Sequence, residues 1–487
     1  MVPTTAFLLR VPRWFGGTRR GSLPATAMSP AFVRICLATV CGWLTAIACA
    51  AQSELPKGAG ANCPPLPRDL DLRSALSLAL EHSPVIAEVR EQIREQEGVL
   101  IVAKAERRPR VDVVGAYDVI QNTRIEGFGP FESEGQSWNF DVRLSHTIYA
   151  GGQLAASSKS AAARVCAAES RMRTVIDGVL LEVSRHCFDA LLAKEVIAVQ
   201  EEAVGVLDRQ LQTAKAAYDA GSRPQFDVLQ AEVALANARP PVIRARNQYR
   251  LAIDRLRRAI GMPYPDGCEA DKVRLTQSWP NPKVNEQLGA LLLQGLANRP
   301  ELAELANQIK AAESDIKAAQ SMHKPRVEMY GTYGAQSLRF AGNAGEGLAG
   351  ATGGVRFTVP IFDFGRTEGQ VVQATSRLQE IEARTEQQRL SIEGEVRQAF
   401  FDYDEASQIL RTSELVVKQA EEALRLAQNR FHAGALTQLE ILQSRLDLTR
   451  AQLERAQALH SYNVAAASLR HAVGTISREV AGPAKEQ

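Results

Sequence analysis

Apolar residues recur every seven positions along two long stretches of the chain that contain no proline. Each stretch has 68 residues, one between Gly152 and Gly221 and one between Gly365 and Gly434. The repeating positions are Ile176, Val183, Ala190, Ile197, Val204, Leu211 and Tyr218 in the first stretch, and Val396, Tyr403, Leu410, Val417, Leu424 and Phe431 in the second. A strict seven-residue period favours supercoiled helix packing. We therefore predict helices over 153–220 and 366–433, each about 100 Å long at 1.5 Å per residue.

A second seam accompanies each long helix. It reads Val179, His186, Ala193, Gln200, Leu207 and Ala214 in the first stretch, and Ile392, Ala399, Ala406, Ser413, Ala420 and Ala427 in the second. A two-stranded coiled-coil rod would favour leucine in this seam. Small residues instead let neighbouring backbones approach closely, which favours a helix packed on both flanks, as in a wall of helices. The rod is the alternative.

Shorter helices precede and follow each long one. Helical stretches over 72–107 and 288–323 each end at a proline. Return helices are predicted over 225–260 and 437–473, after glycine turns. The apolar period continues in the second of them at Leu439, Leu446, Leu453, His460 and Ala467, and the first begins with Phe226, Leu229 and Val233.

Alternating apolar and polar residues predict four strands, over 111–122, 136–149, 327–337 and 352–362. In the second of these, Trp138, Phe140, Val142 and Leu144 alternate with polar residues. This pattern fits a half-buried soluble sheet, and it fits equally a sheet with lipid on one face and water on the other. The strand lengths match one membrane crossing of about 9–11 residues. The loops over 122–136 and 338–352 are rich in glycine and polar residues, as external loops would be.

These elements occur twice in the same order. The segment His82–Val89 reappears as Asn298–Leu305 at an offset of 216, and Ala217–Ala231 reappears as Arg430–Ser444 at an offset of 213. We interpret 72–261 and 288–474 as a duplicated unit, with a Pro-rich segment over 51–71, a linker or equatorial segment over 262–287 and a tail over 475–487. Four strands are too few to close a membrane barrel, whose smallest forms have about eight. Several copies must therefore share one.

The first 50 residues are predicted to be a lead and signal peptide. An apolar run follows Arg34, and the small residues Ala48 and Ala50 suit cleavage near Ala50. The alternative of a membrane anchor requires about 20 apolar residues, which is longer than this run. Translation from Met28 rather than Met1 and lipidation of Cys49 are further alternatives.

Composition and motifs exclude several function classes. A net charge of +2 over 487 residues gives no global attraction for nucleic acid. The glycines Gly345, Gly347 and Gly350 form a G-x-G-x-x-G match, but they lie between predicted strands and open no helix. The histidines show no metal-ligand spacing, and no nucleophile elbow or paired CxxC is present. We expect no enzyme, no metal and no cofactor.

Four cysteines follow the predicted signal. Cys166 and Cys187 lie 21 residues apart on one predicted helix, about 31 Å at 1.5 Å per residue, which is too far for a disulfide. Cys63 and Cys268 lie in connections rich in proline and glycine. In an exported protein they could form a disulfide, and the alternative is two inert thiols.

The duplicated pattern resembles the TolC-like outer-membrane efflux proteins. The resemblance rests on helices that end in proline, the strand pairs, the segment VPIFDFGR at 359–366 and the segment RFHAGALTQLEILQS at 430–444. It covers Leu72 to Gly474 and implies a mostly α fold with membrane β structure, in which a homotrimer forms a 12-stranded β-barrel continued by a long α-helical barrel. It implies contact with lipid of the outer membrane of a Gram-negative bacterium, and extension into the periplasm.

The same resemblance implies a function and partners. It implies a passive exit duct of a tripartite efflux or type I secretion system, which receives substrates from a periplasmic adaptor protein and an inner-membrane pump. A periplasmic coiled-coil scaffold or adaptor protein is the alternative function.

The resemblance also places a functional site at the turns between the long and return helices. Gly221 and Gly434 are matched to tip turns, where Phe431 and the glycines would contribute to adaptor docking. Asp227 and Glu440 each follow a turn glycine by six residues. In a trimer they would place six carboxylates near the constriction, where they would favour cations.

A closed gate in such proteins joins an aromatic residue, an arginine and this acid. Tyr218 and Arg223 keep these residue types in the first repeat, whereas the second has Phe431 and Leu436. A rewired contact between Arg223 and Glu440 is one hypothesis. Ordinary turn and capping chemistry is the alternative for these residues.

Overall fold

The computed structural model describes residues 69–121, 134–222, 224–262, 274–276, 278–280, 282, 284, 286–337, 347–433 and 435–477. The predicted signal peptide, Cys49, Cys63, Cys268, Arg223 and Gly434 lie outside the described residues, as does most of the two interstrand loops.

Eight helices of eight residues or more lie in this part of the chain. Those of the first repeat are α2 (Leu72–His82), α3 (Pro84–Ala105), α4 (Gln153–Asp219) and α5 (Gln225–Ile260). Those of the second are α6 (Leu288–Asn298), α7 (Pro300–Gln320), α8 (Arg366–His432) and α9 (Gln438–Ala472), with a short 3₁₀ turn η2 (Ser321–His323) after α7. Each long helix has 67 residues.

The two stretches that precede the strands are each broken into two helices, which corrects the prediction of continuous helix over 72–107 and 288–323. The breaks fall at Ser83 and Arg299, which both have extended backbone conformations. Pro84 and Pro300 follow them. Proline disfavours the helical conformation in the residue before it, yet is well suited to the first position of a new helix. Both breaks therefore have the same local cause.

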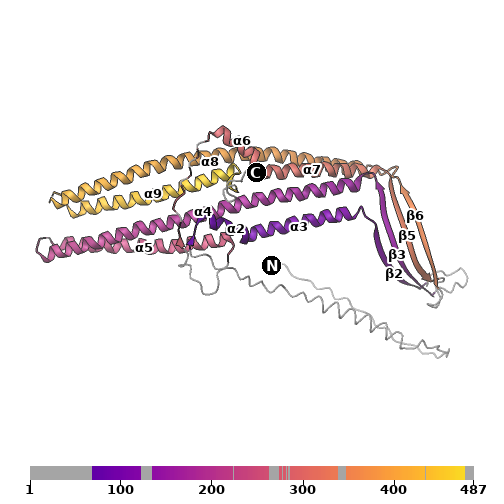
Figure 1. Cartoon of the computed structure of the whole chain (residues 1–487), viewed down its shortest axis with the longest axis horizontal. Helices are drawn as coiled ribbons and strands as arrows, with labels where there is room; N and C mark the ends of the chain where they lie inside the picture. The colour runs from indigo at the N-terminus through magenta and orange to yellow at the C-terminus, as the bar shows by residue number, and fades with distance from the viewer. Residues whose placement is uncertain are drawn as a thin grey trace, which may run out of the picture. The chain divides into compact units, whose positions relative to one another are not determined.

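Each long helix is flanked by shorter helices along its length. Helix α4 contacts α3 and α7 over one part and α5 and α9 over the other, while α8 contacts α7 and α9 (Figure 1). Because α4 packs against α2, α3, α5, α7 and α9, the predicted wall of helices is confirmed and the two-stranded rod is wrong. None of the described helices is both long enough and apolar enough to span a bilayer.

The heptad seams form the cores of the two repeats. Val183 and Ala190 of α4 are fully buried in a cluster with residues of α2 and α5, and Ile392 and Val396 of α8 are fully buried in a second cluster with residues of α6 and α9. Full burial of a side chain such as Val or Ile contributes about 1.5–3 kcal/mol. Close packing of the seams therefore holds each hairpin together.

The chain after α9 also packs into the first core. Ile476 is buried there, so the predicted tail over 475–487 begins with packed residues. Ser477 hydrogen-bonds Asp177 of α4, whose pKa is raised chiefly by burial. This short segment joins the end of the second repeat to the long helix of the first.

The two cysteines in the described residues are both free, as the sequence predicted. Cys187 lies in the first core cluster, and burial raises the pKa of its thiol to about 12. The thiol therefore stays protonated and unreactive at neutral pH.

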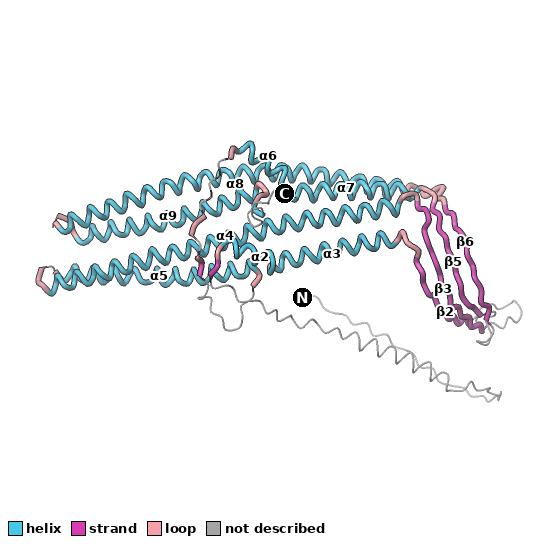
Figure 2. The backbone as a smooth tube through the Cα atoms, in the orientation of Figure 1, coloured by secondary structure: helices cyan, strands magenta, loops and turns pink. Residues whose placement is uncertain are grey.

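Four strands form one antiparallel sheet in the order β2-β3-β5-β6 (Figure 2). They are β2 (Arg110–Gln121), β3 (Glu134–Ala150), β5 (Arg326–Ser337) and β6 (Gly347–Thr358). A separate parallel pair joins β1 (Asp69–Leu70) to β4 (Arg274–Leu275). Within the described residues, β2 and β6 each pair on one side only, so the sheet has two open edges.

The last strand lies earlier than expected. The sequence predicted 352–362, whereas β6 runs from Gly347 to Thr358 and pairs with β5 throughout. Pro360 lacks the backbone N–H that a ladder needs, and it limits the strand at its end. Gly347 and Gly350 of the G-x-G-x-x-G match both lie inside β6, where no helix follows to bind a phosphate.

The two faces of the sheet differ in chemistry. One row across all four strands reads Val113, Val142, Tyr333 and Ala351, and the next row reads Asp112, Arg143, Thr332 and Thr352. The apolar face is largely exposed on the single chain, and the opposite face carries the charged side chains. The predicted alternation is confirmed.

A buried charge cluster fixes the start of α7. The side chain of Arg299 is 4% exposed and forms ion pairs with Glu395 of α8 and Glu301, and it donates a hydrogen bond to the backbone oxygen of His471. Burial first, and the nearby charge of Arg299 second, lower the pKa of His471 to about 4. The matching position in the first repeat is Ser83, so only the second repeat contains this cluster.

We expect His471 to make the fold less stable in mild acid. The unfolded chain protonates this histidine near pH 6.5, whereas the folded chain does so only near pH 4. Its contribution to the free energy of unfolding is therefore fully present above pH 6.5 and is lost as the pH falls towards 4. In denaturant unfolding between pH 7.5 and 4.5, the variant His471→Gln should lose less stability on acidification than the wild type.

The exposed His323 provides the control for this prediction. The variant His323→Gln should show the wild-type pH dependence. Carboxyl groups with a raised pKa, such as Asp177, make the fold more stable as the pH falls, which is opposite to the effect of His471. These groups are present in every variant, so a difference between the variants reports on His471 alone. Equal pH dependence in wild type and His471→Gln would contradict the prediction.

Candidate functional site

Helix α4 ends in a glycine turn that reverses the chain. Gly221 has φ of +70°, a conformation that glycine adopts without the steric cost of a side chain. The N–H of Ser222 donates to the oxygen of Ala217 over 2.9 Å, and the N–H of Gly221 donates to the oxygen of Tyr218 over 2.8 Å. These two bonds form a Schellman motif, which satisfies carbonyl groups at the end of the helix.

Helix α8 ends in a related turn. The N–H of Ala435 donates to the oxygen of Arg430 over 2.9 Å, and that of Ala433 donates to the oxygen of Asn429 over 3.1 Å. The first of these bonds matches the bond from Ser222 to Ala217 in the first repeat. The predicted tip turns therefore occur in both repeats, although Gly434 itself lies outside the described residues.

The predicted gate residues are only partly placed. Tyr218 lies in the last turn of α4 with its side chain exposed, and Phe431 lies at the matching position of α8 and is half-buried. Because Arg223 is outside the described residues, its predicted contact with Glu440 stays a hypothesis.

Glu440 is held in a capping box at the start of α9. Its carboxylate accepts from the backbone N–H of Thr437 over 2.8 Å and from the hydroxyl of Thr437 over 2.9 Å, while that hydroxyl accepts from the backbone N–H of Glu440. The backbone bond first, and the hydroxyl bond second, lower the pKa of Glu440. The capping chemistry considered from the sequence is therefore present, and it keeps an exposed carboxylate ionised at the tip.

Asp227 occupies the matching position in the first turn of α5. Its backbone N–H donates to the oxygen of Pro224 over 3.1 Å, and Pro224 provides no side-chain cap. Both acids thus lie within the first turn of a return helix, where the helix dipole stabilises negative charge. The structure places Asp227 and Glu440 at equivalent points of the two repeats.

A large apolar groove lies beside these tips, between α4, α5 and α9. Its volume is about 780 Å³. The apolar side chains along it include Phe226, Leu229, Val233, Leu439, Leu442 and Leu446. Sequence reasoning identified most of these residues as a packing seam of the return helices, but all except Leu442 are exposed large side chains on the single chain. The apolar pattern of the return helices identified most of these residues in the sequence. Only the tertiary structure shows that they form an open surface.

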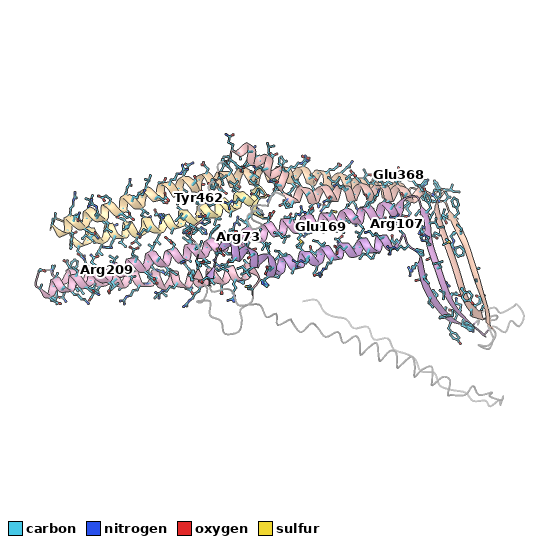
Figure 3. The ribbon with its side chains drawn as sticks, viewed as in Figure 1. Arg73, Arg107, Glu169, Arg209, Glu368 and Tyr462 are labelled. Atoms are coloured by element: carbon cyan, nitrogen blue, oxygen red, sulfur yellow. The ribbon has the colours of Figure 1, made fainter. Side chains whose placement is uncertain are left out.

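Charged side chains border this groove. Glu202, Arg445 and Arg450 are among its lining residues. Burial first, and the positive charge of Arg209 on α4 second, lower the pKa of Arg445 (Arg209 is labelled in Figure 3). Among the described residues, no group of three or more His, Cys, Asp or Glu side chains is placed to hold a metal ion.

Comparisons with known proteins agree with this architecture. Residues 75–262 and 291–475 each match the model of the family described as outer membrane efflux protein. The outer membrane efflux protein BepC of Brucella suis is 21% identical over 411 residues, which cover 84% of this chain and 87% of BepC. The outer membrane protein TolC of Vibrio cholerae is 24% identical over 416 residues, which cover 81% of this chain and 91% of TolC.

The fold also matches a solved channel structure. The CmeC outer membrane channel of Campylobacter jejuni superposes with a TM-score of 0.70 at 15% sequence identity, covering 84% of this chain and 88% of CmeC. Because the family model matches well over half of the chain, in two consecutive copies, the chain belongs to the outer membrane efflux protein family and is an outer-membrane efflux channel, a transport protein and not an enzyme.

Proposed function

We propose that this channel is the exit duct of a tripartite efflux or type I secretion system, in which it passively conducts substrates from a periplasmic adaptor and an inner-membrane pump to the outside. The observation that carries the proposal is a sheet with two open edges and one apolar face that continues into helical hairpins. Such a chain can form part of the wall of a passage, with its sheet in the membrane and its helices in the space beneath it. Membership of a channel family favours the duct over the scaffold or adaptor alternative.

The open edges of the sheet would need to pair with strands of neighbouring copies of the chain. Each unpaired backbone group exposed to lipid costs several kcal/mol, and β2 and β6 each have one unpaired side among the described residues. Pairing β2 of one copy with β6 of the next satisfies both edges. Three copies would give a closed sheet of twelve strands, and the number three follows from the resemblance to TolC-like proteins.

The helices at the two margins of the chain carry matching apolar surface. Large exposed side chains on α8 include Leu390, Phe401, Ile409 and Leu415, and those on α3 and α5 include Ile101, Val102, Ile243 and Leu251. Large apolar side chains exposed along these helices fit surfaces that a neighbouring copy would cover. In a closed ring, α8 of one copy would cover α3 and α5 of the next.

The two faces of the sheet would then meet different solvents. The row through Val113, Val142 and Tyr333 would face lipid, and the row through Asp112 and Arg143 would face the water-filled passage. This orientation gives a physical reason for an apolar face that is exposed on the single chain.

At the opposite end, Asp227 and Glu440 would supply six carboxylates to the entrance in a trimer. Rings of carboxylates attract cations and repel anions at close range. Glu440 keeps its negative charge because its hydrogen bonds to Thr437 lower its pKa. The tips are therefore the proposed site of ion selectivity.

We expect the double variant Asp227→Asn and Glu440→Gln to conduct cations less selectively. Glutamine retains the capping interaction with Thr437, so the fold should survive the loss of charge. The reversal potential across a planar bilayer under a salt gradient should shift towards zero. The control is the double variant Glu380→Gln and Glu386→Gln, which removes two exposed acids from α8 away from the tip and should keep wild-type selectivity. Unchanged selectivity in the tip variant would rule out this role.

The groove between α4, α5 and α9 is the proposed docking surface for the adaptor. An amphipathic helix binds a groove through apolar residues at helical spacing, and Phe226, Leu229 and Val233 present such a row along α5. The bordering Glu202 and Arg445 would pair with polar residues at the edge of the incoming helix. A helical hairpin of a periplasmic adaptor is the partner that this chemistry fits.

Photo-crosslinking in growing cells tests this docking surface. A photoreactive amino acid in place of Leu229 should capture a periplasmic protein with a helical hairpin, whereas the same amino acid in place of Val85, an exposed apolar residue at the start of α3, should not. The variant Leu229→Glu should weaken export while the channel still inserts and conducts. Capture of this class of protein only from position 85, or full export by Leu229→Glu, would contradict the proposal.

A further inference from the structure

A second pocket lies where the sheet joins the helices. It has a volume of about 310 Å³ and lies between the ends of β3 and α7 and the starts of β5, α4 and α8. We call it the junction pocket. Figure 3 labels Arg107 and Glu368, which mark this level of the molecule at the end of α3 and the start of α8.

The junction pocket is electropositive. Its lining includes three cationic side chains, Lys324, Arg326 and Arg366, and one carboxylate, Asp363. The positive charges therefore outnumber the negative charge by two. Asp363 is already engaged by its own turn, since it accepts hydrogen bonds from the N–H groups of Gly365 and Thr367 and from the Thr367 hydroxyl. Glu368 lies in the same turn but is not part of the lining.

Two of the three cations have no anionic partner within the described residues. Arg326 pairs with Glu328 over 2.6 Å. The side chains of Lys324 and Arg366 form neither an ion pair nor a hydrogen bond with any described residue. The side-chain oxygen of Gln370, which also lines the pocket, is buried and has no hydrogen-bond partner there. The pocket thus holds two positive side chains that the described part of the chain leaves without an anionic partner.

The backbone positions one of these cations by a close approach. Gly151 has φ of +61°, and a Cβ atom built on it would lie 2.5 Å from the Cβ of Lys324. A glycine at this point therefore allows Lys324 to lie against the start of α4. The first repeat has Arg108 and Arg110 at the positions of Lys324 and Arg326, but Gln153 at the position of Arg366.

Arg326, which lines the pocket, belongs to the charged face of the sheet. Arg326 pairs in register with Thr358, and the neighbouring pair on that face is Glu328 with Arg356. In the proposed duct this face lines the passage, so the pocket would meet solutes rather than lipid. The level of the passage with this cluster, where the sheet joins the helices, would be positive, and the tip end, with Asp227 and Glu440, would be negative.

We propose that the junction pocket is a binding site for oxyanions in the wall of the passage, suited to a solute that carries a phosphate or a pair of carboxylates. Arg366 would bind two oxygens through its planar guanidinium group, and Lys324 would add a mobile point charge. The site goes beyond a simple duct because it gives the passage a preference for anionic solutes where the sheet joins the helices. The inference rests on the proposed orientation of the sheet.

Conductance measurements on the full-length channel in a planar bilayer test the site, with inorganic pyrophosphate as the probe at constant ionic strength. Pyrophosphate added on the sheet side should reduce the current, and addition on the tip side should have less effect because the carboxylates there repel it. The double variant Lys324→Gln and Arg366→Gln should need at least about tenfold more pyrophosphate for half-block, since each charge-assisted hydrogen bond contributes roughly a factor of ten.

The matched control removes two cations from elsewhere on the same helix. Arg384 and Arg389 of α8 pair with Glu380 and Glu386 on the helix surface. The double variant Arg384→Gln and Arg389→Gln should be blocked like the wild type. Absence of block in a conducting wild type, or equal block in the Lys324 and Arg366 variant, would overturn the site while leaving the duct intact. A wild type that does not conduct would instead overturn the duct.

A measurement on the unaltered chain covers the case in which the variant fails to fold. An amine-acetylating reagent, followed by peptide mass spectrometry, reports the accessibility of each lysine. Pyrophosphate should slow the acetylation of Lys324 and leave that of the exposed Lys418 on α8 unchanged. Equal rates at Lys324 with and without pyrophosphate would contradict the proposal.

Discussion

A sheet of four strands has two strands that lack a neighbour on one side, and the rest of the molecule is arranged around that constraint. In the described residues, β2 and β6 are these strands, and they lie at opposite edges. Because lipid offers no hydrogen bonds to a peptide group, open edges and an exposed apolar face are compatible with a membrane only if another chain pairs with them. Assembly is therefore part of the proposed fold.

The long helices also depend on several neighbours for their packing. A long helix cannot bury its whole length against one partner, so α4 and α8 each pack against different shorter helices in their two halves. The heptad seams hold these contacts, while the margins of the wall keep exposed leucine, isoleucine and phenylalanine side chains. Duplication supplies two such walls per chain, and the second repeat differs by its buried Arg299, its capped Glu440 and its third pocket cation, Arg366.

Much of this architecture could be predicted because its signals are local. The seven-residue period indicated the long helices, and the glycines that flank the proline-free stretches located α4 and α8 to within one residue at each end. The alternation of apolar and polar residues identified both faces of the sheet. The breaks before Pro84 and Pro300 were missed although proline gives a local signal for them. The start of β6 was also missed, because its first residues, from Gly347, are mostly glycine and alanine, and only pairing with β5 makes them a strand.

The candidate sites were predictable only in part. The resemblance to TolC-like proteins identified Asp227 and Glu440, each six residues after a turn glycine, and Thr437 three residues before Glu440 is a recognisable capping signal. The groove and the junction pocket depend on distant segments. Lys324 and Arg366 are 42 positions apart in the sequence, and Phe226 and Leu446 are 220 apart. No periodicity within one helix indicates that such residues line a common surface.

The pairing of edge strands between copies can be observed directly by electron cryomicroscopy of the full-length channel in lipid nanodiscs. We expect β2 of each copy to be hydrogen-bonded to β6 of another copy, so that the sheet closes around a passage lined by Asp112, Arg143 and Thr332. A folded single copy in the bilayer, with both edges covered by its own chain, would contradict the central claim.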